Sequence, residues 1–339
     1  MTRDPLRVLW VTNMLYEPGA ASPRGIFVTQ SRDALRATGR VAIETEVVAQ
    51  GRGALDYLGA NTRVRARWDA GRFDLVHVHY GLTGLATLAL PSLAPRMFTF
   101  YGSDLNDAVQ RTVSVATARN AARRIFVSRR LADLWPDPAN VVLPNGVDFA
   151  ACAPRPREDA CRELGLDPAK RYVLFGARPE NPVKGHDVFV EVLRRLRDRR
   201  PDVEELVLTE PGASHERVVA KLNAAHVLLF TSRRGTEGSP TVVKEALAVG
   251  LPVVSTDVGD AKEMLAGVEP GGVVAWPNED SAVARDAWLE ALSLSAGAIL
   301  DSGRRSDGRE KRAALRQEAV TERLLAIYEE VHDLSRQPS

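Results

Sequence analysis

Residues 226–256, HVLLFTSRRGTEGSPTVVKEALAVGLPVVST, indicate the class of fold. The first apolar run ends at Thr231, and after a short polar loop a helix is predicted to start near Pro240. Proline suits the first turn of a helix, where its missing N–H has no bond to lose. Gly250 ends that helix, and the apolar residues 251–255 follow it. A strand, a loop, a helix and a second strand in this order form the βαβ unit of a parallel α/β sheet.

The loop before this helix suits a ligand that carries both phosphate and hydroxyl groups. Parallel sheets bind ligands beyond the carboxyl ends of their strands, and the unpaired N–H groups of a helix start attract an anion. Glu237 precedes the helix and Glu245 lies within it, and carboxylates accept hydrogen bonds from hydroxyls. An ordinary loop with solvent-facing glutamates is the alternative interpretation.

The spacing of Glu237 and Glu245, with seven residues between them, resembles the signature of the GT-B glycosyltransferases of the family 4 type. The runs EGSPTVVKEALA and PVVSTDVGD resemble its bacterial cell-surface-polysaccharide branch, which includes teichuronic-acid-type transferases. The resemblance implies that Glu237 lies by the donor sugar and that Glu245 binds the nucleotide ribose. It also implies that the sugar and diphosphate meet the intervening residues Gly238, Ser239, Pro240, Thr241 and Val242.

Two cations stand at the start of another predicted helix. Arg178 and Lys184 follow the predicted strand 171–175 and precede a long apolar-faced segment. Cations at a helix start oppose the helix dipole unless an anion binds there; ordinary surface cations are the alternative. The pair resembles the Arg and Lys-Gly of the family, which grip the donor diphosphate. The resemblance therefore implies that Arg178, Lys184 and Glu237 act in catalysis, with no metal ion and no cofactor.

The first half of the chain adds candidates at the ends of predicted strands. The family often has Gly-Gly near the donor diphosphate, where this chain has Arg24-Gly25, so only Gly25 is carried over. Alternation along the predicted strand 73–80 places His77 and His79 on one face. His79 lies nearer the carboxyl end and is the better site candidate, whereas His77 is expected in the core. With no further His or Cys nearby, we predict no metal site here.

The run Tyr101-Gly-Ser-Asp104 resembles the His-Gly-Ser-Asp of the family, except at its first residue. The family's histidine lies by the reacting centre, and a phenol can donate a hydrogen bond but is not readily charged near neutral pH. Tyr101 is therefore a catalytic candidate that departs from the family. A helix N-cap is an alternative or additional role for Asp104. The acceptor-side candidates are His79, Tyr80, Ser103 and Asp104.

Two domains and a returning helix are expected, in the α/β class with two doubly wound Rossmann-like domains facing a cleft. The run PNGVD at 144–148 resembles the family's turn at the domain junction, and the proline-rich linker 153–156 follows it. We place an acceptor-side domain at 1–150 and a nucleotide-sugar-binding domain at 151–309. In GT-B folds the last helix crosses back to the first domain, as we expect of residues 310–339.

Composition gives no indication of a nucleic-acid partner, because the net charge is only +1 while 45% of residues are hydrophobic. Residues 1–150 hold 18 Arg, no Lys and 13 Asp plus Glu. This basic bias suits an anionic acceptor or peripheral contact with a membrane; compositional scatter is the alternative.

Compartment and membrane signals are few. Cys152 and Cys161 are too few for a disulfide framework or a metal cluster, and we expect both to be reduced in the cytoplasm. We expect no signal peptide, because the apolar run after Pro5 is interrupted by Arg7. We also expect no membrane span, because no stretch approaches the ~20 apolar residues that a bilayer requires.

The resemblance extends over nearly the whole chain and implies a retaining glycosyltransferase of the hexosyltransferase type. The donor is a nucleotide-diphosphate sugar, with UDP-sugar favoured. The acceptor is a hydroxyl of a lipid-linked saccharide, a glycan or a small natural product. Two alternatives stay open. One is a nucleotide-sugar 2-epimerase of the GT-B fold, and the other is a non-catalytic nucleotide-sugar-binding relative, which the departure at Tyr101 favours.

Overall fold

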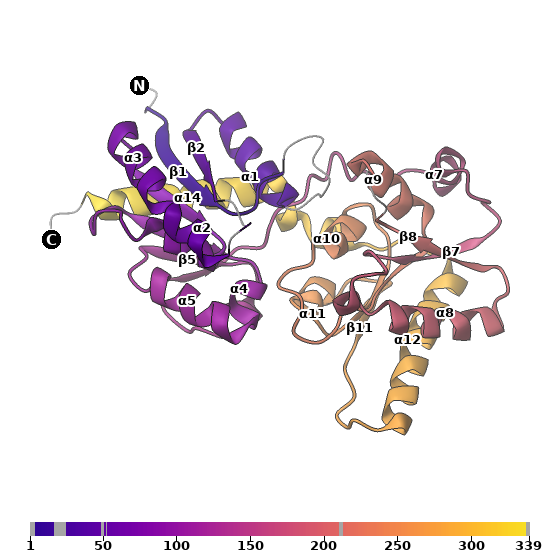
Figure 1. The fold of residues 1–339 in the computed structure, drawn as a ribbon. Coiled ribbons are helices and arrows are strands. Elements are labelled where there is room, and N and C mark those ends of the chain that lie inside the picture. The colour runs from indigo at the N-terminus through magenta and orange to yellow at the C-terminus, as the bar shows by residue number, and fades with distance from the viewer. Residues whose placement is uncertain (1–3, 17–24, 49–50, 52, 210–212, 337–339) are drawn as a thin grey trace. The chain divides into compact units, whose positions relative to one another are not determined.

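The computed structural model describes residues 4–16, 25–48, 51, 53–209 and 213–336 (Figure 1). The chain forms two compact units. Unit 1 consists of Met1–Gly146 and Gln317–Ser339, and unit 2 consists of Val147–Arg316. The sequence placed these two transitions at residues 151 and 310.

Unit 1 is built on a six-stranded parallel sheet in the order β2-β1-β3-β4-β5-β6. Its strands are β1 (Leu6–Thr12), β2 (Val41–Val47), β3 (Leu75–His79), β4 (Arg96–Phe100), β5 (Arg123–Phe126) and β6 (Asn140–Val142). Its helical elements are α1 (Ile26–Ala37), α2 (Ala54–Gly59), α3 (Asn61–Gly71), η1 (Gly81–Thr87), α4 (Ser103–Asn106), α5 (Ala108–Ala118), α6 (Arg129–Ala132) and α14 (Gln317–Ser335). Every residue of β3 is buried, because parallel sheets are covered on both faces.

The chain leaves unit 1 at Gly146 and re-enters it at Gln317, two residues that are neighbours in space. In unit 1, Gly146 packs so closely on Gln317 that a Cβ on this glycine would lie 2.8 Å from the Gln317 Cα. In unit 2, the Val147 N–H donates to the Leu315 carbonyl at 2.9 Å, and Val147 pairs with Arg316 in a parallel bridge. Unit 2 is therefore an insertion between two segments of unit 1.

Helix α14, drawn in yellow beside the strands of unit 1, completes the core of this unit (Figure 1). Its residues Leu324 and Tyr328 share an apolar cluster with Trp10 of β1. The buried Tyr328 hydroxyl accepts a hydrogen bond from Trp10 Nε1 at 2.9 Å and lies 2.7 Å from Nδ1 of His77. These bonds let a phenol occupy an apolar core, since a buried polar group without a partner costs about 1–3 kcal/mol.

Replacing His77 by glutamine is expected to make unit 1 less sensitive to acid. Burial lowers the pKa of His77 to about 3, whereas a histidine in an unfolded chain titrates near ~6.5. As the pH falls below this value, the unfolded chain binds a proton that the folded chain does not bind. The wild type therefore loses about 1.4 kcal/mol of stability per pH unit relative to His77→Gln.

Urea denaturation of both proteins at roughly pH 7.5, 6.5 and 5.5 measures this difference. The comparison with the variant cancels the effect of other groups that titrate in the same range, such as Asp104. Parallel stability profiles would show that His77 is not held neutral in the folded protein.

Unit 2 has a five-stranded parallel sheet in the order β11-β10-β9-β7-β8. Its strands are β7 (Arg171–Phe175), β8 (Val203–Val207), β9 (Val227–Phe230), β10 (Val253–Thr256) and β11 (Gly272–Val274). Its helical elements are α7 (Arg157–Leu164), η2 (Pro182–Lys184), α8 (His186–Arg199), α9 (His215–Ala224), α10 (Thr241–Ala248), α11 (Ala261–Leu265), α12 (Ala282–Ser302), α13 (Gly308–Lys311) and η3 (Ala313–Leu315). The strand order reverses between β7 and β9, as it does between β1 and β3 in unit 1. These two sheets confirm the predicted α/β class with two Rossmann-like units.

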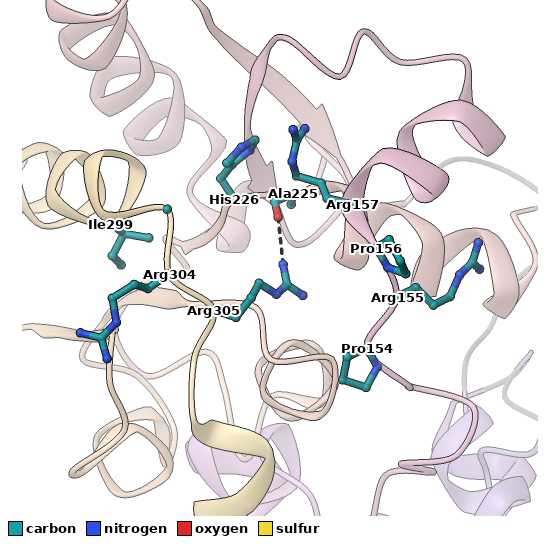
Figure 2. Close-up of a pocket in the computed structure, with 10 residues that line it drawn as sticks. Pro154, Arg155, Pro156, Arg157, Ala225, His226, Ile299, Arg304 and Arg305 are labelled. Atoms are coloured by element: carbon teal, nitrogen blue, oxygen red, sulfur yellow. Dashed lines mark hydrogen bonds between the residues drawn. The ribbon is translucent and has the colours of Figure 1, made fainter.

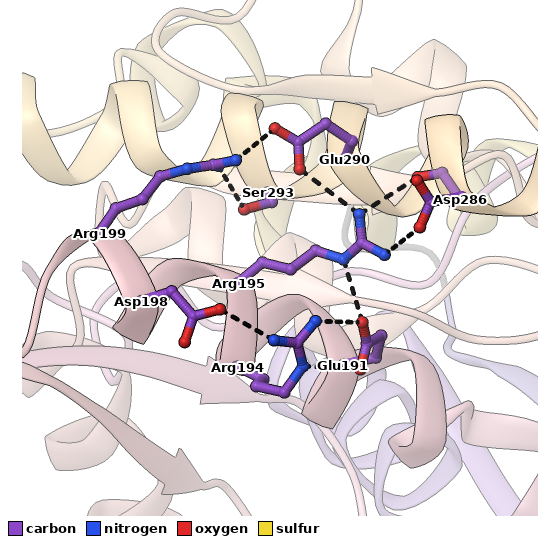
Figure 3. A network of polar contacts seen from close by, with 8 residues as sticks. All are labelled: Glu191, Arg194, Arg195, Asp198, Arg199, Asp286, Glu290 and Ser293. Carbon is purple, nitrogen blue, oxygen red and sulfur yellow. Dashed lines mark hydrogen bonds and ion pairs between the residues drawn. The ribbon is translucent and has the colours of Figure 1, made fainter.

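Helices α8 and α12 pack against each other on the sheet of unit 2. Their apolar residues, among them Val192 and Leu292, belong to one core cluster. On the solvent side Arg195 of α8 pairs with Glu191 at 3.1 Å and reaches across to Asp286 of α12 at 2.5 Å (Figure 3). Exposed ion pairs contribute only about 0.2–1 kcal/mol each, so the apolar contacts supply most of the stability. Neither these helices nor any other helix in the described part of the chain combines the length and apolar character of a bilayer span.

Two local expectations from the sequence differ from the structure: a helix that opens at 81–84 and is rich in Leu and Ala, and a loop over the very polar stretch 302–312. The helix expected from Gly81 is the 3₁₀ helix η1, in which Gly84 lies so close to Thr117 that a Cβ would be 2.4 Å from the Thr117 hydroxyl oxygen. The stretch 302–312, expected to be a loop, contains the end of α12 and the helix α13. Its polar character misled the prediction, because Arg309 there turns inward and donates to the carbonyls of Phe149 and Cys152, at 2.9 Å each.

Candidate functional site

The strand order of unit 2 predicts a ligand site at the carboxyl ends of β7 and β9. Open parallel sheets bind ligands where the strand order reverses. The loop after β7 carries Arg178 and leads to η2, which ends at Lys184. The loop after β9 carries Glu237 and leads to α10. The donor-site candidates of both loops therefore lie at one edge of the sheet.

These two loops are tied together through their backbones. The Thr231 hydroxyl donates to the Gly185 carbonyl at 2.9 Å, and the Arg233 N–H donates to the Val183 carbonyl at 2.8 Å. Gly185 has a φ of +67°, and a Cβ there would lie 2.2 Å from the Thr231 carbonyl oxygen. Only glycine fits this position, and the close approach fixes Lys184 beside the second loop.

Lys184 and Glu237 form an ion pair at this edge. The Nζ of Lys184 lies 2.6 Å from Oε1 of Glu237, which also accepts a hydrogen bond from the Ser232 hydroxyl at 2.6 Å. The Lys184 and Glu237 side chains are 26% and 11% exposed, so the pair is shielded but reachable. Arg178 is exposed and, within the described residues, has no ion-pair partner. The structure thus brings Lys184 and Glu237 together and leaves the Arg178 guanidinium available to a ligand.

The start of α10 lies between the two glutamates of the motif. The Ser239 hydroxyl donates to Oδ2 of Asp260 at 2.6 Å. Gly259 has a φ of +56°, and a Cβ there would lie 2.8 Å from the Gly238 carbonyl oxygen. Pro240 precedes the first turn of α10, whose N–H groups have no acceptor within the helix. The predicted contacts Gly238, Ser239, Pro240, Thr241 and Val242 therefore form one anchored helix start.

A buried lysine, Lys244, lies in the first turns of this helix. It was not identified as a site residue from the sequence. Lys244 is fully buried; burial lowers its pKa to about 8, against the attraction of Asp260 and Glu245. Burial likewise raises the pKa of Asp260 to about 6, while Lys244 and the bond from Ser239 oppose this rise. At neutral pH the two charges therefore stabilise each other beneath Ser239. The sequence does contain a signal for this burial. Lys244 lies three residues before the core residue Leu247, so helical spacing puts both on the same, buried face of the helix.

From the sequence alone, His215 is expected to be a solvent-exposed residue at a helix start, but the structure pairs it with Glu245. His215 does begin α9, but its Nε2 lies 3.1 Å from Oε1 of Glu245, and the two side chains are 28% and 14% exposed. The hydrogen bond to Glu245 raises the pKa of His215. Residues 210–212, part of the loop in which the family holds the nucleotide base, lie outside the described residues.

Unit 1 gathers its candidates at the carboxyl ends of β3 and β4. The Tyr101 hydroxyl lies 2.7 Å from Nδ1 of His79, and the Tyr80 hydroxyl lies 2.9 Å from the Ser103 hydroxyl. Tyr80 has a φ of +75°, a strained conformation for a residue with a Cβ and one that is common at functional sites. The structure thus brings four of the predicted residues together as two hydrogen-bonded pairs.

The His79–Tyr101 pair is uncharged at neutral pH. Burial lowers the pKa of His79 well below its ordinary value, and His77 beside it adds to this effect. Burial and the nearby Asp104 charge raise the pKa of Tyr101 well above its ordinary value. Within the described residues, Nε2 of His79 is buried without a hydrogen-bond partner. The pair can therefore take part in hydrogen bonds at the sheet edge, but it contributes no net charge there at neutral pH.

The position of Asp104 favours a structural role over contact with an acceptor. Its side chain is fully buried, and its carboxylate accepts hydrogen bonds from the backbone N–H groups of Gly81 and Tyr101, at 3.1 Å each, and Gly102, at 2.8 Å. Burial raises the pKa of Asp104 to about 6, and these backbone bonds oppose the rise. An acceptor hydroxyl has no access to this carboxylate.

Gly25, the remaining donor-side candidate, precedes α1 in unit 1. Its φ is +81°, and a Cβ there would lie 2.7 Å from the carbonyl carbon of Met14. The glycine thus permits a close approach of two backbone segments just beyond β1. Its neighbour Arg24 lies outside the described residues.

A cavity of about 440 Å³ lies at the opposite, amino-terminal edge of the unit 2 sheet (Figure 2). Nδ1 of His226 accepts a hydrogen bond from the Tyr172 N–H at 3.0 Å, so Nε2 carries the ring hydrogen. Burial, with the charge of Arg157, lowers the pKa of His226 to about 4. Arg305 donates to the carbonyl of Ala225 at 3.3 Å. The cavity contains none of the predicted site residues; it is lined by Pro154, Arg155, Pro156, Arg157, Ala225, His226, Ile299, Gly303, Arg304 and Arg305.

Both halves of the chain match known families. Residues 25–151 match the family described as Glycosyltransferase Family 4, and residues 170–293 match the one described as Glycosyl transferases group 1. The second match includes the loops after β7 and β9 and both glutamates of the motif.

Curated relatives and a solved structure agree with these matches. The D-inositol 3-phosphate glycosyltransferase of Pseudarthrobacter chlorophenolicus is 28% identical over 58% of this chain and 57% of its own length. The chain thus spans little more than half of that relative. The phosphatidyl-myo-inositol mannosyltransferase of Mycolicibacterium smegmatis is 29% identical over 79% of this chain and 78% of its own length. Anabaena HepE, solved in complex with UDP and glucose, has a TM-score of 0.65 at 15% identity, covering 96% of this chain and 100% of that one.

The identity to HepE is low enough that the likeness concerns the fold alone. The two family matches fall on the two parallel-sheet units described above. The chain therefore carries the domains of a GT-B glycosyltransferase, a family 4 domain followed by a group 1 domain.

Proposed function

We propose that the chain transfers a hexose from a nucleotide-diphosphate sugar, with UDP-sugar favoured, to an acceptor hydroxyl, with retention of configuration and without a metal ion. The observation that carries this proposal is the 2.6 Å pair of Lys184 and Glu237 at the strand-order reversal of unit 2. It places a cation and a carboxylate beside a helix start, which matches a ligand with both phosphate and hydroxyl groups.

In the proposed complex the donor diphosphate takes the place of Glu237 as the partner of Lys184. Arg178, exposed at the same edge, supplies a planar fork of donors, and the first N–H groups of α10 supply further hydrogen bonds. Neutralising the departing diphosphate is the main catalytic effect. Glu237, released from Lys184, accepts hydrogen bonds from the donor sugar, and Glu245 accepts them from the ribose.

The transfer step breaks the bond between the anomeric carbon and the diphosphate oxygen. The acceptor oxygen bonds to that carbon from the same face, and its proton passes to the departing phosphate oxygen. The products are a glycoside with unchanged configuration and a nucleoside diphosphate. Tyr101, hydrogen-bonded to the neutral His79, is proposed to face the reacting centre as a hydrogen-bond donor.

The acceptor is a hydroxyl of a lipid-linked saccharide, a glycan or a small natural product. The names of the relatives support testing inositol phosphates and phosphatidylinositol first. Uridine is proposed as the base because the family resemblance of the sequence favours a UDP-sugar. A lipid acceptor would bring the basic first half of the chain to an anionic membrane surface.

Calorimetric titration of the purified chain with UDP, GDP and ADP, in the presence of a metal chelator, tests the donor site. We expect one nucleotide series, that of uridine, to bind more tightly than the others. Incubation of the matching nucleotide sugars with inositol phosphate and phosphatidylinositol then tests transfer.

Each outcome separates the proposal from its alternatives. Donor binding followed by acceptor-dependent release of the diphosphate supports the transferase. Turnover of the nucleotide sugar without any acceptor would support the 2-epimerase, and binding without turnover would support the non-catalytic relative. Absence of binding in every series contradicts the proposal.

A further inference from the structure

Three side chains with metal-binding atoms meet beside the start of the donor site in unit 2. We propose that Cys152, His215 and Glu245 bind a divalent transition metal of the zinc class, and that this metal competes with the nucleotide for Glu245. The metal site stands on its own geometry, whereas the competition rests on the proposed function.

The distances are close to those of a zinc site. One sulfur, one ring nitrogen and one carboxylate oxygen of these residues all lie within 4.8 Å of one another. Nε2 of His215 and Oε1 of Glu245 are already 3.1 Å apart. Around tetrahedral zinc, with bonds of about 2.0–2.3 Å, neighbouring ligand atoms lie about 3.3–3.7 Å apart. Small side-chain movements therefore suffice to close the site.

The three ligands come from separately anchored segments of unit 2. The Cys152 N–H donates to the Asp148 carbonyl at 2.9 Å, and Arg309 donates to the Cys152 carbonyl at 2.9 Å, which holds the loop in place. His215 is the first residue of α9, and Glu245 lies in the second turn of α10. The site is thus built on fixed elements rather than on one mobile loop.

The ligand types also fit the zinc class. Thiolate, imidazole and carboxylate are its usual protein ligands, and a site with three of them leaves a fourth position open. The sulfur is buried while the imidazole and carboxylate are partly exposed, so an ion enters from the side that the nucleotide ribose is proposed to use. A carboxylate that binds a metal can no longer accept both ribose hydroxyls, which is the basis of the competition.

Cys161 provides the matched control. It is a reduced, buried cysteine of the same unit, but its sulfur lies 3.7 Å from the guanidinium of Arg157. A cation at this distance disfavours metal binding. Cys152→Ser and Cys161→Ser therefore remove equivalent sulfur atoms from two different settings.

Titration of the full chain with cobalt(II), under reducing conditions that leave cobalt in solution, tests the site directly. Cobalt replaces zinc in such sites, and a thiolate ligand gives a charge-transfer absorption band. We expect the band in the wild type and in Cys161→Ser, and its loss in Cys152→Ser. If Cys152→Ser does not fold, His215→Ala, a change at a partly exposed side chain, is expected to weaken the cobalt affinity instead. No band in the wild type, or an equal band in a folded Cys152→Ser protein, overturns the proposal.

The competition is tested on the same protein with UDP. We expect UDP to remove the cobalt band, and zinc at ten times its dissociation constant to weaken UDP binding about tenfold. UDP binding that leaves the band intact overturns the competition. If UDP does not bind the metal-free chain at all, the proposed function fails and the competition fails with it, whereas the cobalt band still decides the metal site.

Discussion

Replacement of Lys184 by alanine is expected to weaken UDP binding by about 10- to 150-fold, which corresponds to ~1.5–3 kcal/mol for a hydrogen bond to a charged group. The variant loses the cation that the proposed diphosphate contact requires. It also removes the cation that lies 2.6 Å from the Glu237 carboxylate, so the negative charge of this carboxylate then repels the incoming phosphates. Calorimetric titration of both proteins with UDP, without added metal, measures the change.

The control is Lys170→Ala, which removes a lysine whose Nζ lies 3.6 Å from Glu204 and which follows no predicted ligand loop. We expect Lys170→Ala to bind UDP like the wild type, and all the proteins to unfold at similar temperatures. Arg178→Ala should weaken binding in the same direction as Lys184→Ala. Unchanged UDP affinity in both Arg178→Ala and Lys184→Ala would contradict the proposal that these two side chains bind the donor diphosphate.

Replacement of Asp104 by alanine is expected to destabilise unit 1 by about 3 kcal/mol or more, because several buried backbone N–H groups lose their acceptor together. Its carboxylate accepts hydrogen bonds from Gly81, Tyr101 and Gly102. For a unit of this size, such a loss lowers the melting temperature by roughly 6–12 °C. Asp104→Asn should recover part of it, because the amide oxygen can still accept from Tyr101 and Gly102, whereas the NH₂ group cannot accept from the Gly81 N–H. Thermal unfolding followed by circular dichroism gives the result.

Asp107→Ala is the control for a nearby aspartate with an ordinary capping role. Among the described residues, the Asp107 carboxylate accepts one backbone N–H bond, from Gln110 at 2.8 Å at the start of α5, so a loss of about 1 kcal/mol is expected. A melting temperature of Asp104→Ala close to that of the wild type, together with weakened acceptor binding, would instead place Asp104 in contact with the acceptor.

The sequence was sufficient for elements whose pattern is local. The strand at Arg171–Phe175 was predicted to the residue, because an apolar run is set by neighbours along the chain. The alternation that placed His77 and His79 on one face is confirmed by their ring centroids, which are 3.9 Å apart.

Partners that are distant in sequence could not be predicted in this way. The pairing of Lys184 with Glu237 and the contact of His215 with Glu245 depend on how two loops meet at a sheet edge. The periodicity of apolar residues along the chain carries no information about which loops lie side by side in the fold. For the same reason Cys152 was set aside as one of only two cysteines, although the fold brings a histidine and a glutamate to its sulfur.

The insertion of unit 2 between Gly146 and Gln317 has a consequence for the order of assembly. Before unit 2 folds, docking α14 on the strands of unit 1 must close a loop of roughly 170 residues, at an entropic cost of about 5 kcal/mol. Once unit 2 has folded, its Val147–Leu315 hydrogen bond has already closed that loop, and α14 begins next to the segment that it must join. A folded unit 2 thus lowers the entropic cost of docking the C-terminal helix on unit 1. A mutation that unfolds unit 2 is therefore expected to destabilise unit 1 as well.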